Sequence, residues 1–463
     1  MTPLWTAAAL RAATGGSLAA EPAISGISID SRSVAPGDLF VALRDARDGH
    51  DFVADALARG AACAMVDRAP PGVAPDAALL RVADTLAGLT ALGAAGRARF
   101  AGKLAAVTGS VGKTGTKEML RLLLAAIGPT HAAMASYNNH WGVPLTLARM
   151  PAEAGFAVIE IGMNNPGEIA PLAALARPQV AAVTAIGEAH IGHMGGLGAI
   201  AAEKGSIVTG LVAGGIAVLP RDSAFFGQLA AQARAAGVVR IIGFGRDPAA
   251  EIRLLEAVTG PEGTRASLAV QGRQVAIAMP ALGLHHAENA CCALAVVAAL
   301  GEDAARAAPA LAGYAPGAGR GAPREIAVGG GTALLIDESY NAAPPAMRAA
   351  LASLALRPGA RRIAVLGDMR ELGGFAMALH RDLAAEADSA ADRVFCCGPE
   401  MAHLYAALPP GKRGAHAPDS AALAPIVQAA LRPGDVILVK GALGSRMAVV
   451  VRALTEQDHR GAA

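Results

Sequence analysis

The chain has 463 residues, and its 40 lysines and arginines nearly balance its 38 aspartates and glutamates, which gives a formal net charge of +2. At roughly 150 residues per domain, this length predicts about three domains. With 53% hydrophobic and 17% charged residues, the chain is not a disordered one, and the near-neutral charge excludes a bulk nucleic-acid binder.

The sequence predicts neither membrane insertion nor disulfide bonds. The mean hydropathy is +0.41, but no run of about 20 apolar residues is free of polar breaks. The first residues lack the charged-then-apolar order of a signal peptide. The five cysteines, which are Cys63 and the adjacent pairs 291–292 and 396–397, show no Cys-x-x-Cys spacing. We therefore expect a cytoplasmic protein with reduced, buried thiols.

In chain order, the predicted elements fall into three blocks, which we place at residues 1–98, 99–315 and 316–463. The first block ends in an Ala- and Arg-rich helical stretch at residues 86–99. The second alternates strand-like and helical runs, an order typical of a parallel sheet covered by helices. Its predicted strands are residues 103–107, 156–161, 180–184, 216–219 and 239–243, followed by a hairpin at 264–279 around Gly272.

A Gly- and Pro-rich stretch at residues 316–323 is the best candidate for a linker between domains. After it, a second α/β pattern begins, in which Ala-rich helical runs separate four strand-like runs. These predicted strands are residues 333–336, 363–366, 393–397 and 435–439.

The sharpest local signal is a Gly-rich turn between a predicted strand and a predicted helix. Residues 104–116 read LAAVTGSVGKTGT. The backbone N–H groups of such a turn and the helix N-terminus attract a phosphate, Lys113 can reach the β- and γ-phosphates, and the Thr114 hydroxyl can bind Mg²⁺. Val107 stands where the full P-loop pattern has its first glycine, so the match is to a shorter form. The strand–turn–helix context favours nucleotide binding over an ordinary turn.

Three further polar residues come after predicted strands of the second block. Glu160 either caps a turn or, at the carboxyl edge of a parallel sheet beside the phosphate loop, ligates a metal. His190 follows the next strand, and although a single histidine is more often structural, this one falls on the edge that faces the phosphates. Lys204, by spacing alone, is a surface lysine.

The order and spacing of many such pieces resemble the Mur ligase family, the ATP-dependent amide-forming enzymes of peptidoglycan precursor synthesis, over nearly the whole chain. The pieces are TGSVGKT (108–114), NNHWGVPLT (138–146), EIGMNNPGE (160–168), GEAH (187–190), EKG (203–205), HHAENA (285–290), GR (319–320), DESYNA (337–342), LGDMRELG (366–373), VKG (439–441) and GSR (444–446). The second, third and ninth most resemble the members that add D-alanyl-D-alanine.

The resemblance implies a three-domain α/β fold. The first domain is expected to be a small mixed α/β domain that holds the UDP end of the substrate. It carries DSR (30–32), GDLFVAL (37–43) and GHDF (49–52). The central domain is expected to be a P-loop ATP-binding domain with a mostly parallel sheet. The last is expected to be a Rossmann-like domain that binds the incoming dipeptide.

The resemblance also implies the reaction. ATP phosphorylates the terminal carboxylate of UDP-N-acetylmuramoyl-tripeptide, and the amine of D-alanyl-D-alanine attacks the acyl phosphate to give the pentapeptide, ADP and phosphate. The implied partners are these two substrates, with ATP and two Mg²⁺ sites. We expect the chain to be a monomer. The third residue of the peptide, diaminopimelate or lysine, stays open.

Residue roles are carried over from the family by position. Catalysis is assigned to Lys113, Glu160, His190 and Lys204, the last matching a lysine that CO₂ converts into a carbamate. Mg²⁺ is assigned to Thr114, Glu160, His190 and the carbamylated Lys204. ATP is assigned to Gly109, Ser110, Val111, Gly112, Lys113, Thr114, Gly115, Asn289, Arg320, Asp337, Tyr340 and Asn341. The UDP end is assigned to Ser31, Arg32 and His50, and the remaining substrate contacts to Asn138, Asn139, Lys440, Ser445 and Arg446.

Several alternatives stay open at this stage. The chain departs from the family pattern at Glu338, where a second Asp is common, at Ala343 and at Trp141. The competing functions are a related ligase with another substrate (folylpolyglutamate synthetase included), a P-loop switch or assembly ATPase, and a non-catalytic nucleotide binder.

Single residues also have structural readings. Asp368 and Glu371 can be read simply as turn caps. Lys440 and Arg446 can be read as a solvated pair at a strand end. Four histidines are as consistent with a structural role as with ligand contact: His140, His193, His285 and His286.

Acyl phosphates hydrolyse, so we expect the third domain to close over the nucleotide and bring Arg320 and Asp337 to it. A chain without ligands is then expected to be open, with its first or third domain displaced.

Overall fold

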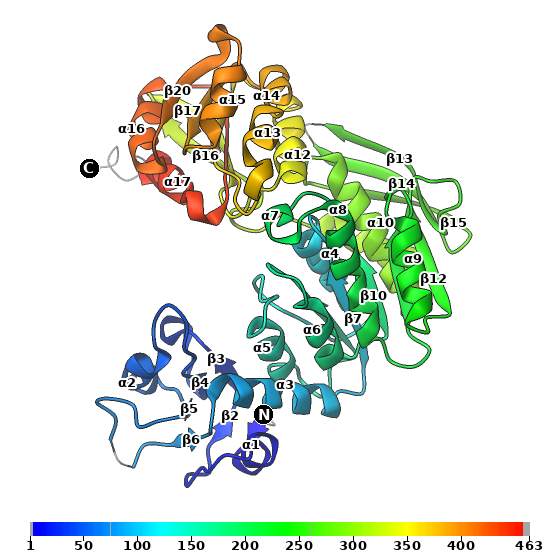
Figure 1. Cartoon of the computed structure of the whole chain (residues 1–463), viewed down its shortest axis with the longest axis vertical. Coiled ribbons are helices and arrows are strands. Elements are labelled where there is room, and N and C mark those ends of the chain that lie inside the picture. The colour runs from blue at the N-terminus through cyan, green and yellow to red at the C-terminus, as the bar shows by residue number, and fades with distance from the viewer. Residues whose placement is uncertain (1–2, 75, 261, 457–463) are drawn as a thin grey trace.

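The computed structural model describes residues 3–74, 76–260 and 262–456, which form three α/β units (Figure 1). Residues 1–2 and 457–463, at the outer ends of the first and last predicted domains, lie outside the described residues. The first unit lies at one end of the long axis of the molecule, the third unit at the other end, and the second unit connects them.

The first unit has a four-stranded parallel sheet in the order β3-β4-β5-β6 and a separate two-stranded pair, β1-β2. Its helices and strands are β1 (Trp5–Thr6), α1 (Ala7–Thr14), β2 (Ala23–Ile24), β3 (Gly26–Ser28), β4 (Asp38–Val41), α2 (Val53–Ala58), β5 (Cys63–Val66), β6 (Leu79–Arg81) and α3 (Thr85–Arg99). Every residue of β4 and β5 is buried, as expected of strands covered on both faces.

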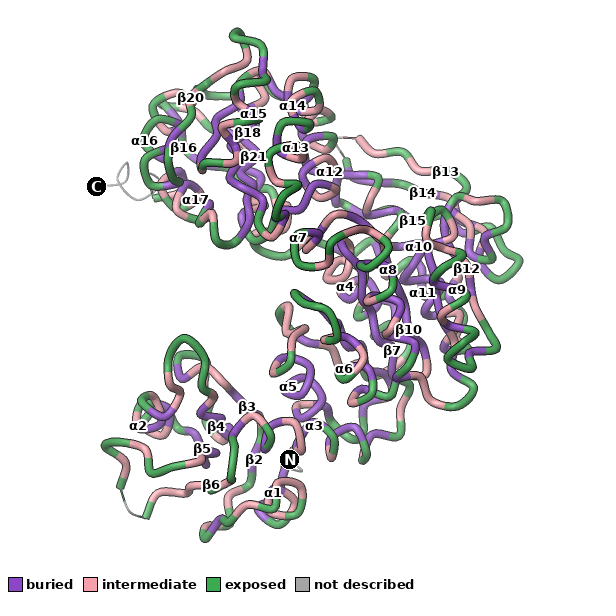
Figure 2. The backbone as a smooth tube through the Cα atoms, in the orientation of Figure 1, coloured by how far each residue is buried: buried purple, intermediate pink, exposed green. Residues whose placement is uncertain are grey.

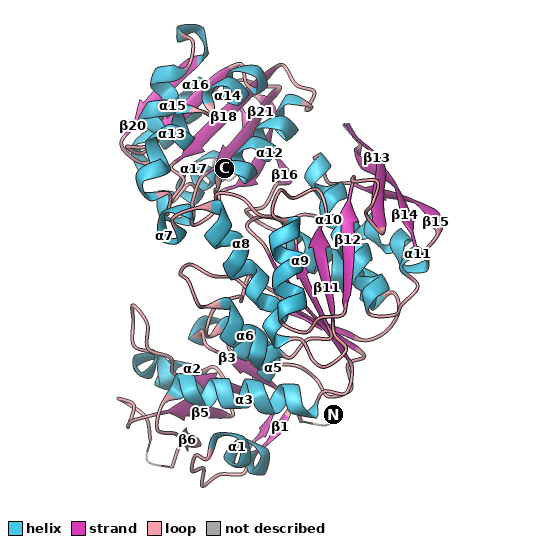
Figure 3. Cartoon of the chain, turned by 45° about the vertical axis from the view of Figure 1, so that its right-hand side comes forward, coloured by secondary structure: helices cyan, strands magenta, loops and turns pink. Residues whose placement is uncertain are grey.

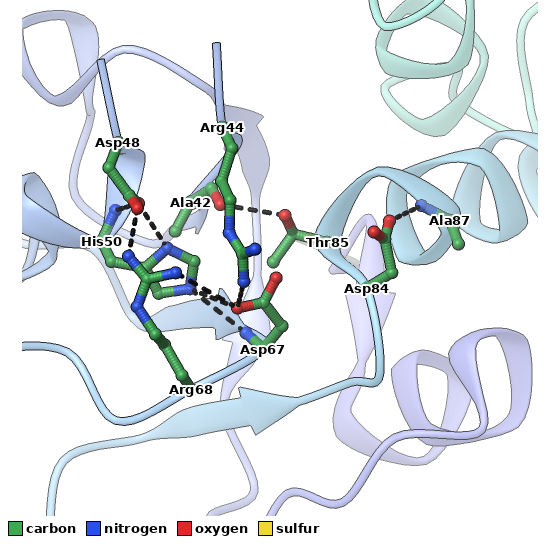
Figure 4. Close-up of polar contacts among 9 residues, drawn as sticks. All are labelled: Ala42, Arg44, Asp48, His50, Asp67, Arg68, Asp84, Thr85 and Ala87. Carbon is green, nitrogen blue, oxygen red and sulfur yellow. Dashed lines mark hydrogen bonds and ion pairs between the residues drawn. The ribbon is translucent and has the colours of Figure 1, made fainter.

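Helix α3 leads from the first unit into the second. The Asp84 carboxylate accepts a hydrogen bond from the Ala87 backbone N–H at 2.7 Å and caps the helix, while the Thr85 hydroxyl donates to the Ala42 carbonyl at 2.9 Å (Figure 4). The helix ends at Arg99, one residue beyond the predicted boundary at 98.

The second unit has a nine-stranded sheet in the order β15-β14-β13-β12-β11-β10-β7-β9-β8, parallel from β8 to β13 and antiparallel beyond. Its helices and strands are β7 (Lys103–Thr108), α4 (Lys113–Ala125), β8 (Thr130–Ala132), α5 (Gly142–Ala148), β9 (Phe156–Glu160), α6 (Ile169–Ala176), β10 (Val180–Val183), α7 (Ile191–Met194), α8 (Leu197–Gly205), β11 (Ile216–Pro220), α9 (Phe226–Ala235), β12 (Arg240–Gly245), β13 (Ile252–Gly260), β14 (Gly263–Val270), β15 (Arg273–Met279), α10 (Leu284–Ala299) and α11 (Ala304–Ala307).

Helices cover both faces of this sheet (Figure 3). Successive residues of β7 point to opposite faces, so Ala105 and Val107 join the core beneath α4 and α10, and Ala106 joins the core on the other face. The buried residues follow the strands through the middle of the unit (Figure 2). The neighbouring parallel strands β10, β7 and β9 end at the same edge, and the loops that follow them converge there.

The third unit has a six-stranded sheet in the order β16-β17-β21-β18-β19-β20, in which only the β16-β17 pair among the described strands is antiparallel. Its helices and strands are β16 (Ala322–Val328), β17 (Gly331–Glu338), α12 (Pro344–Ala355), β18 (Arg361–Gly367), α13 (Ala376–Arg381), α14 (Ala384–Ala390), β19 (Arg393–Cys397), α15 (Met401–Ala407), β20 (Arg413–Ala417), α16 (Ser420–Ala430), β21 (Asp435–Lys440) and α17 (Ala448–Thr455).

The predicted strands of both α/β blocks are confirmed, as is the hairpin, which is β14-β15. The linker prediction was wrong at its end, because Ala322 and Pro323 already belong to β16. Strands β8, β13, β16 and β20 were not predicted. Strand β8 has only three residues, all half-buried, and so carries little hydrophobic pattern. The cysteines named above are all buried and unpaired. Within the described parts of the chain, no helix is both long and apolar enough to cross a bilayer.

Candidate active site

The loop between β7 and α4 is held by contacts that need glycine at two positions. Gly109 and Gly112 have positive φ, and a Cβ would lie 1.9 Å from Thr184 Oγ1 at the first and 2.4 Å from Asn289 Oδ1 at the second. The Thr184 hydroxyl donates to the Val111 carbonyl at 2.6 Å. Thr184, which follows β10, and Asn289 of α10 therefore hold the loop in place. The backbone N–H groups at the N-terminus of α4 stay available to bind an anion.

Lys113 is the first residue of α4, and its ammonium group lies over the loop. Its Nζ donates to the Gly109 carbonyl at 2.6 Å. Burial lowers the pKa of Lys113, while the carboxylate of Glu160 raises it and the guanidinium of Arg320 lowers it. The Lys113 ammonium group can therefore donate to a bound phosphate instead of to the Gly109 carbonyl.

Glu160 ends β9 beside this loop, as the sequence predicts, and is only 1% exposed. Its Oε1 accepts hydrogen bonds from Thr114 Oγ1 at 3.2 Å and from Asn138 Nδ2 at 2.7 Å. Its Oε2 is buried without a hydrogen-bond partner. A buried, half-satisfied carboxylate requires a further cation or donor.

Lys204 is the second buried group that lacks a partner. It lies near the end of α8 with no exposed surface, and its Nζ has no hydrogen-bond partner, so it is not a surface lysine. Burial lowers the pKa of Lys204 well below its usual range, and the charge of Lys113 lowers it further. Burial therefore favours the neutral, nucleophilic form of this amine.

The residues assigned to Mg²⁺ are not all in contact. Thr114 and Glu160 touch, whereas His190 contacts Glu371 of the third unit. In the part of the chain that the structure describes, no three His, Cys, Asp or Glu side chains gather as a metal site. The free Glu160 oxygen and the adjacent Thr114 hydroxyl fit Mg²⁺, which prefers few protein oxygens and keeps several waters.

The third unit reaches this centre through Arg320. Its Nη2 donates to Ser136 Oγ at 2.6 Å, and Ser136 Oγ lies 3.3 Å from Thr114 Oγ1. The guanidinium stacks over the Tyr340 ring at 4.4 Å from its centroid. The sequence motifs did not mark Ser136, because it lies in the loop two residues before the motif at 138–146.

Apart from the fully buried Lys204, these groups line one cleft of about 890 Å³ between the second and third units. Most residues assigned to ATP line it: Ser110, Val111, Gly112, Lys113, Thr114, Gly115, Asn289, Arg320, Tyr340 and Asn341. Gly109 is the first residue of the loop and is buried against Thr184. The Asp337 carboxylate accepts from the Ser339 backbone N–H at 3.0 Å and shapes the turn after β17.

The opposite wall of the cleft carries Lys440, which is 3% exposed. Its Nζ donates to Glu338 Oε2 at 2.7 Å and to the Asn341 carbonyl at 3.0 Å. Reading Lys440 as half of a solvated pair with Arg446 was therefore wrong. Its partner is Glu338, one of the positions where the chain departs from the family pattern.

The other residues assigned to the substrates are placed differently. Asn138 and Asn139 line the cleft, and the Asn139 side chain accepts from the Gly142 backbone N–H at 2.9 Å. Ser445 donates its hydroxyl to the Asp368 carbonyl at 2.7 Å, and Arg446 is exposed.

In the first unit, the residues assigned to the UDP end are buried or already paired with other residues of the same unit. Ser31 is buried, and the exposed Arg32 is paired with Asp30 at 2.6 Å. His50 is fully buried between Asp48, 2.7 Å from Nδ1, and the Asp67 backbone N–H, 3.2 Å from Nε2 (Figure 4). Any contribution of His50 to a UDP site therefore acts through the loop that it supports.

Fold and cleft together define a phosphate-loop α/β protein whose site is completed by a separate, Rossmann-like unit. Models of the Mur ligase middle domain, the Mur ligase glutamate ligase domain and the Mur ligase catalytic domain match residues 107–297, 325–443 and 23–95.

Curated relatives extend this likeness over the whole chain. The UDP-N-acetylmuramoyl-tripeptide–D-alanyl-D-alanine ligase of Escherichia coli is 34% identical and covers 94% of this chain and 95% of its own length. The enzyme of the same name from Synechocystis is 33% identical, with 94% and 93% covered. The chain belongs to the Mur ligase family.

Solved structures agree with the sequence likeness. A structure of MurF from Acinetobacter baumannii matches with a TM-score of 0.83 at 31% identity and covers 98% of this chain and 99% of its own. MurF from Thermotoga maritima, solved in complex with ADP, matches with a TM-score of 0.76 at 26% identity, with 95% and 98% covered. The three-domain α/β architecture predicted from the sequence is confirmed.

Proposed function

We propose that the chain catalyses the ATP-dependent addition of D-alanyl-D-alanine to UDP-N-acetylmuramoyl-tripeptide, a step of peptidoglycan precursor synthesis. The observation that carries the proposal is the cleft in which the phosphate loop, the half-satisfied Glu160 and groups of the third unit face one another. Family membership and the names of the relatives select the substrates.

A carboxylate is a poor acceptor for an amine, so it must first be activated. In the proposed reaction the tripeptide carboxylate attacks the γ-phosphate of ATP, ADP leaves, and the amine displaces phosphate from the acyl phosphate. The two reacting anions repel each other, and Lys113 with the N-terminus of α4 offsets that repulsion. Arg320 would add a second cation from the opposite side of the cleft.

The site fits Mg²⁺, which Thr114 and Glu160 would hold, and His190 lines the same cleft. When bound, Mg²⁺ supplies charge neutralisation for the phosphates. The neutral amine of Lys204 would react with CO₂ to give a carbamate and release one proton, which turns a buried amine into an anionic oxygen donor. The carbamate and two metal positions are proposals, as are the remaining residue roles assigned above.

The units take matching roles in this proposal, with boundaries at residues 98 and 315. The first would hold the UDP end, the second ATP, and the third the dipeptide, near Lys440. The protein would act as a monomer in the cytoplasm.

Phosphate release from ATP and Mg²⁺ tests the proposal, with UDP-N-acetylmuramoyl-tripeptide and D-alanyl-D-alanine added separately and together. Release that needs both substrates is the expected result. Release with neither would indicate a P-loop ATPase instead. Absence of release, with nucleotide still bound, would indicate a different substrate or a binding protein. Lysine and diaminopimelate tripeptides, compared side by side, identify the third residue.

A further inference from the structure

His190 contacts a side chain from a different unit of the molecule. Its Nδ1 is hydrogen-bonded to Glu371 Oε2, and the two residues are 181 positions apart. His190 directly precedes α7 of the second unit, and Glu371 lies in the loop after β18 of the third. Only docking of the third unit onto the second brings the two side chains together.

The two loops meet backbone to backbone, which fixes where Glu371 stands. The Gly192 N–H donates to the Glu371 carbonyl at 2.9 Å. A Cβ on Gly192 would lie 2.4 Å from the Gly373 nitrogen, so this close approach needs a glycine. His190 and Glu371 both have a φ of 63°, a conformation that non-glycine residues rarely adopt, and the docked loops hold them in it.

A contribution to stability does not explain why His190 and Glu371 are paired. The side chains are 19% and 35% exposed, and an ion pair in that setting contributes little to stability. Histidines that ligate metals usually donate their other ring N–H to a carboxylate, which fixes the tautomer and the ring orientation. With Nδ1 engaged by Glu371, Nε2 is the nitrogen that remains for the cleft that His190 lines.

We propose that Glu371 is a positioning residue that orients His190 toward the Mg²⁺ site, so that the site reaches full affinity only when the third unit is docked. This inference rests on the proposed function. Glu371 acts through His190 rather than on the substrates, and the same contact makes docking of the third unit and metal binding favour each other.

The test is Mn²⁺ binding to the full chain with saturating ADP, followed by the electron paramagnetic resonance signal of free Mn²⁺. Glu371→Ala is expected to weaken Mn²⁺ binding by about 10- to 100-fold. Glu371→Gln should keep most of the affinity, because its amide oxygen can accept the same N–H. In a His190→Ala background, Glu371→Ala should cause no further loss.

Glycine variants separate docking from the side-chain contact. Gly192→Ala keeps the His190 and Glu371 side chains unaltered but pushes their two loops apart, and it is expected to weaken Mn²⁺ binding to a similar extent. Gly198→Ala is the matched control, because a Cβ there meets no atom within 4 Å. It should bind Mn²⁺ as the unaltered chain does.

Four results would overturn the inference: unchanged binding in Glu371→Ala, tighter binding, a loss in Glu371→Gln as large as in Glu371→Ala, or a further loss in the His190→Ala background. Tighter Mn²⁺ binding in Glu371→Ala would mean that Glu371 competes with the metal for His190. A loss in Glu371→Gln as large as in Glu371→Ala would mean that Glu371 ligates the metal itself. An unaltered chain that binds ADP but no Mn²⁺ would instead count against the proposed function.

Discussion

The first unit meets the second through two packed helices, whereas the third unit meets it through loops and helix α12. At the first joint, α3 packs along α5, and Gly93 and Gly96 bring the two backbones together. Leu145 and Ala148 of α5 share one apolar core with Trp5 and other residues of the first unit. The first and second units are therefore joined by continuous buried packing.

Buried polar contacts lock this first joint. Trp5 Nε1 donates to the Ala148 carbonyl at 2.9 Å, and Arg149 Nε donates to the Ile27 carbonyl at 2.6 Å. Arg99 stacks over the Trp5 ring at 4.0 Å. Sliding one unit over the other would break several such contacts at once.

The third unit shares a buried apolar core with the second, and contacts that water can reach surround that core. Ile191 and Leu372 continue the apolar core, but around them lie His190 with Glu371, and Arg348 with Glu188, all partly exposed. Exposed ion pairs contribute about 0–1 kcal/mol each. We therefore expect the first joint to be the more rigid of the two, because its polar contacts are less exposed to water.

The largest effect is expected at the helix–helix joint. In Gly96→Ala, the new Cβ would lie 2.3 Å from the Leu147 carbonyl oxygen, a backbone atom that cannot move away easily. Overpacking of this kind should lower the free energy of unfolding by about 3 kcal/mol. Trp5 and Trp141 are the only tryptophans and both lie at this joint, so their fluorescence in urea reports its unfolding.

The control for this substitution is Gly227→Ala in α9, where the Cβ meets no atom within 4 Å. It should leave the midpoint in urea unchanged or raise it. Equal urea midpoints for Gly96→Ala and the unaltered chain would mean that α3 and α5 can move apart at little cost. The first joint would then not be the tighter of the two.

A pH effect is expected from His286, whose ring packs between the rings of His285 and Tyr314. Burial lowers the pKa of His286 well below its usual range, and His285 lowers it further. A histidine with a depressed folded-state pKa stays neutral when folded, so stability falls as the pH drops below the unfolded pKa of about 6.5.

Between pH 7 and pH 5, protonation of this histidine should lower the free energy of unfolding by up to about 2 kcal/mol, and the His286→Phe variant should lose correspondingly less over the same range. The measurement is urea unfolding, followed by circular dichroism, of both chains at both pH values. A variant as pH-sensitive as the unaltered chain would show that His286 is not buried as described.

A smaller effect is expected for Trp5→Phe. The aromatic ring and its contact with Arg99 stay, but the Ala148 carbonyl loses its buried donor, which should lower the free energy of unfolding by about 1 kcal/mol. The fluorescence of the remaining Trp141 gives the measurement. No change in midpoint would indicate that water replaces the lost donor and that the joint is less dry than its burial suggests.

The smallest effect on stability is expected at the joint between the second and third units. Arg348→Ala removes partly exposed ion pairs with Glu188 and Glu386 and should change the free energy of unfolding by about 0.5 kcal/mol or less. Small-angle scattering at rising salt should show the third unit moving away while the tryptophan signal of the first joint stays constant. A simultaneous change in both signals would contradict the contrast between the joints.

The sequence by itself determined the local elements and their chemistry. Apolar runs of strand length, the Gly-rich turn before Lys113 and the position of Glu160 at a strand end place three features on one sheet edge. Parallel strands must end together, so that edge follows from the order of the elements. These features are decided over a few residues, where backbone geometry and periodicity are sufficient.

Only the tertiary structure decided which polar side chains are buried and what they contact. A turn cap was one of the readings that the sequence left open for Glu371, but Glu371 pairs with His190, whereas Asp368 caps α15 through the Met401 N–H at 2.8 Å. Lys204 is buried without a partner. Burial and pairing depend on contacts between units that are far apart in the chain but close in space. A local sequence pattern carries no information about such contacts.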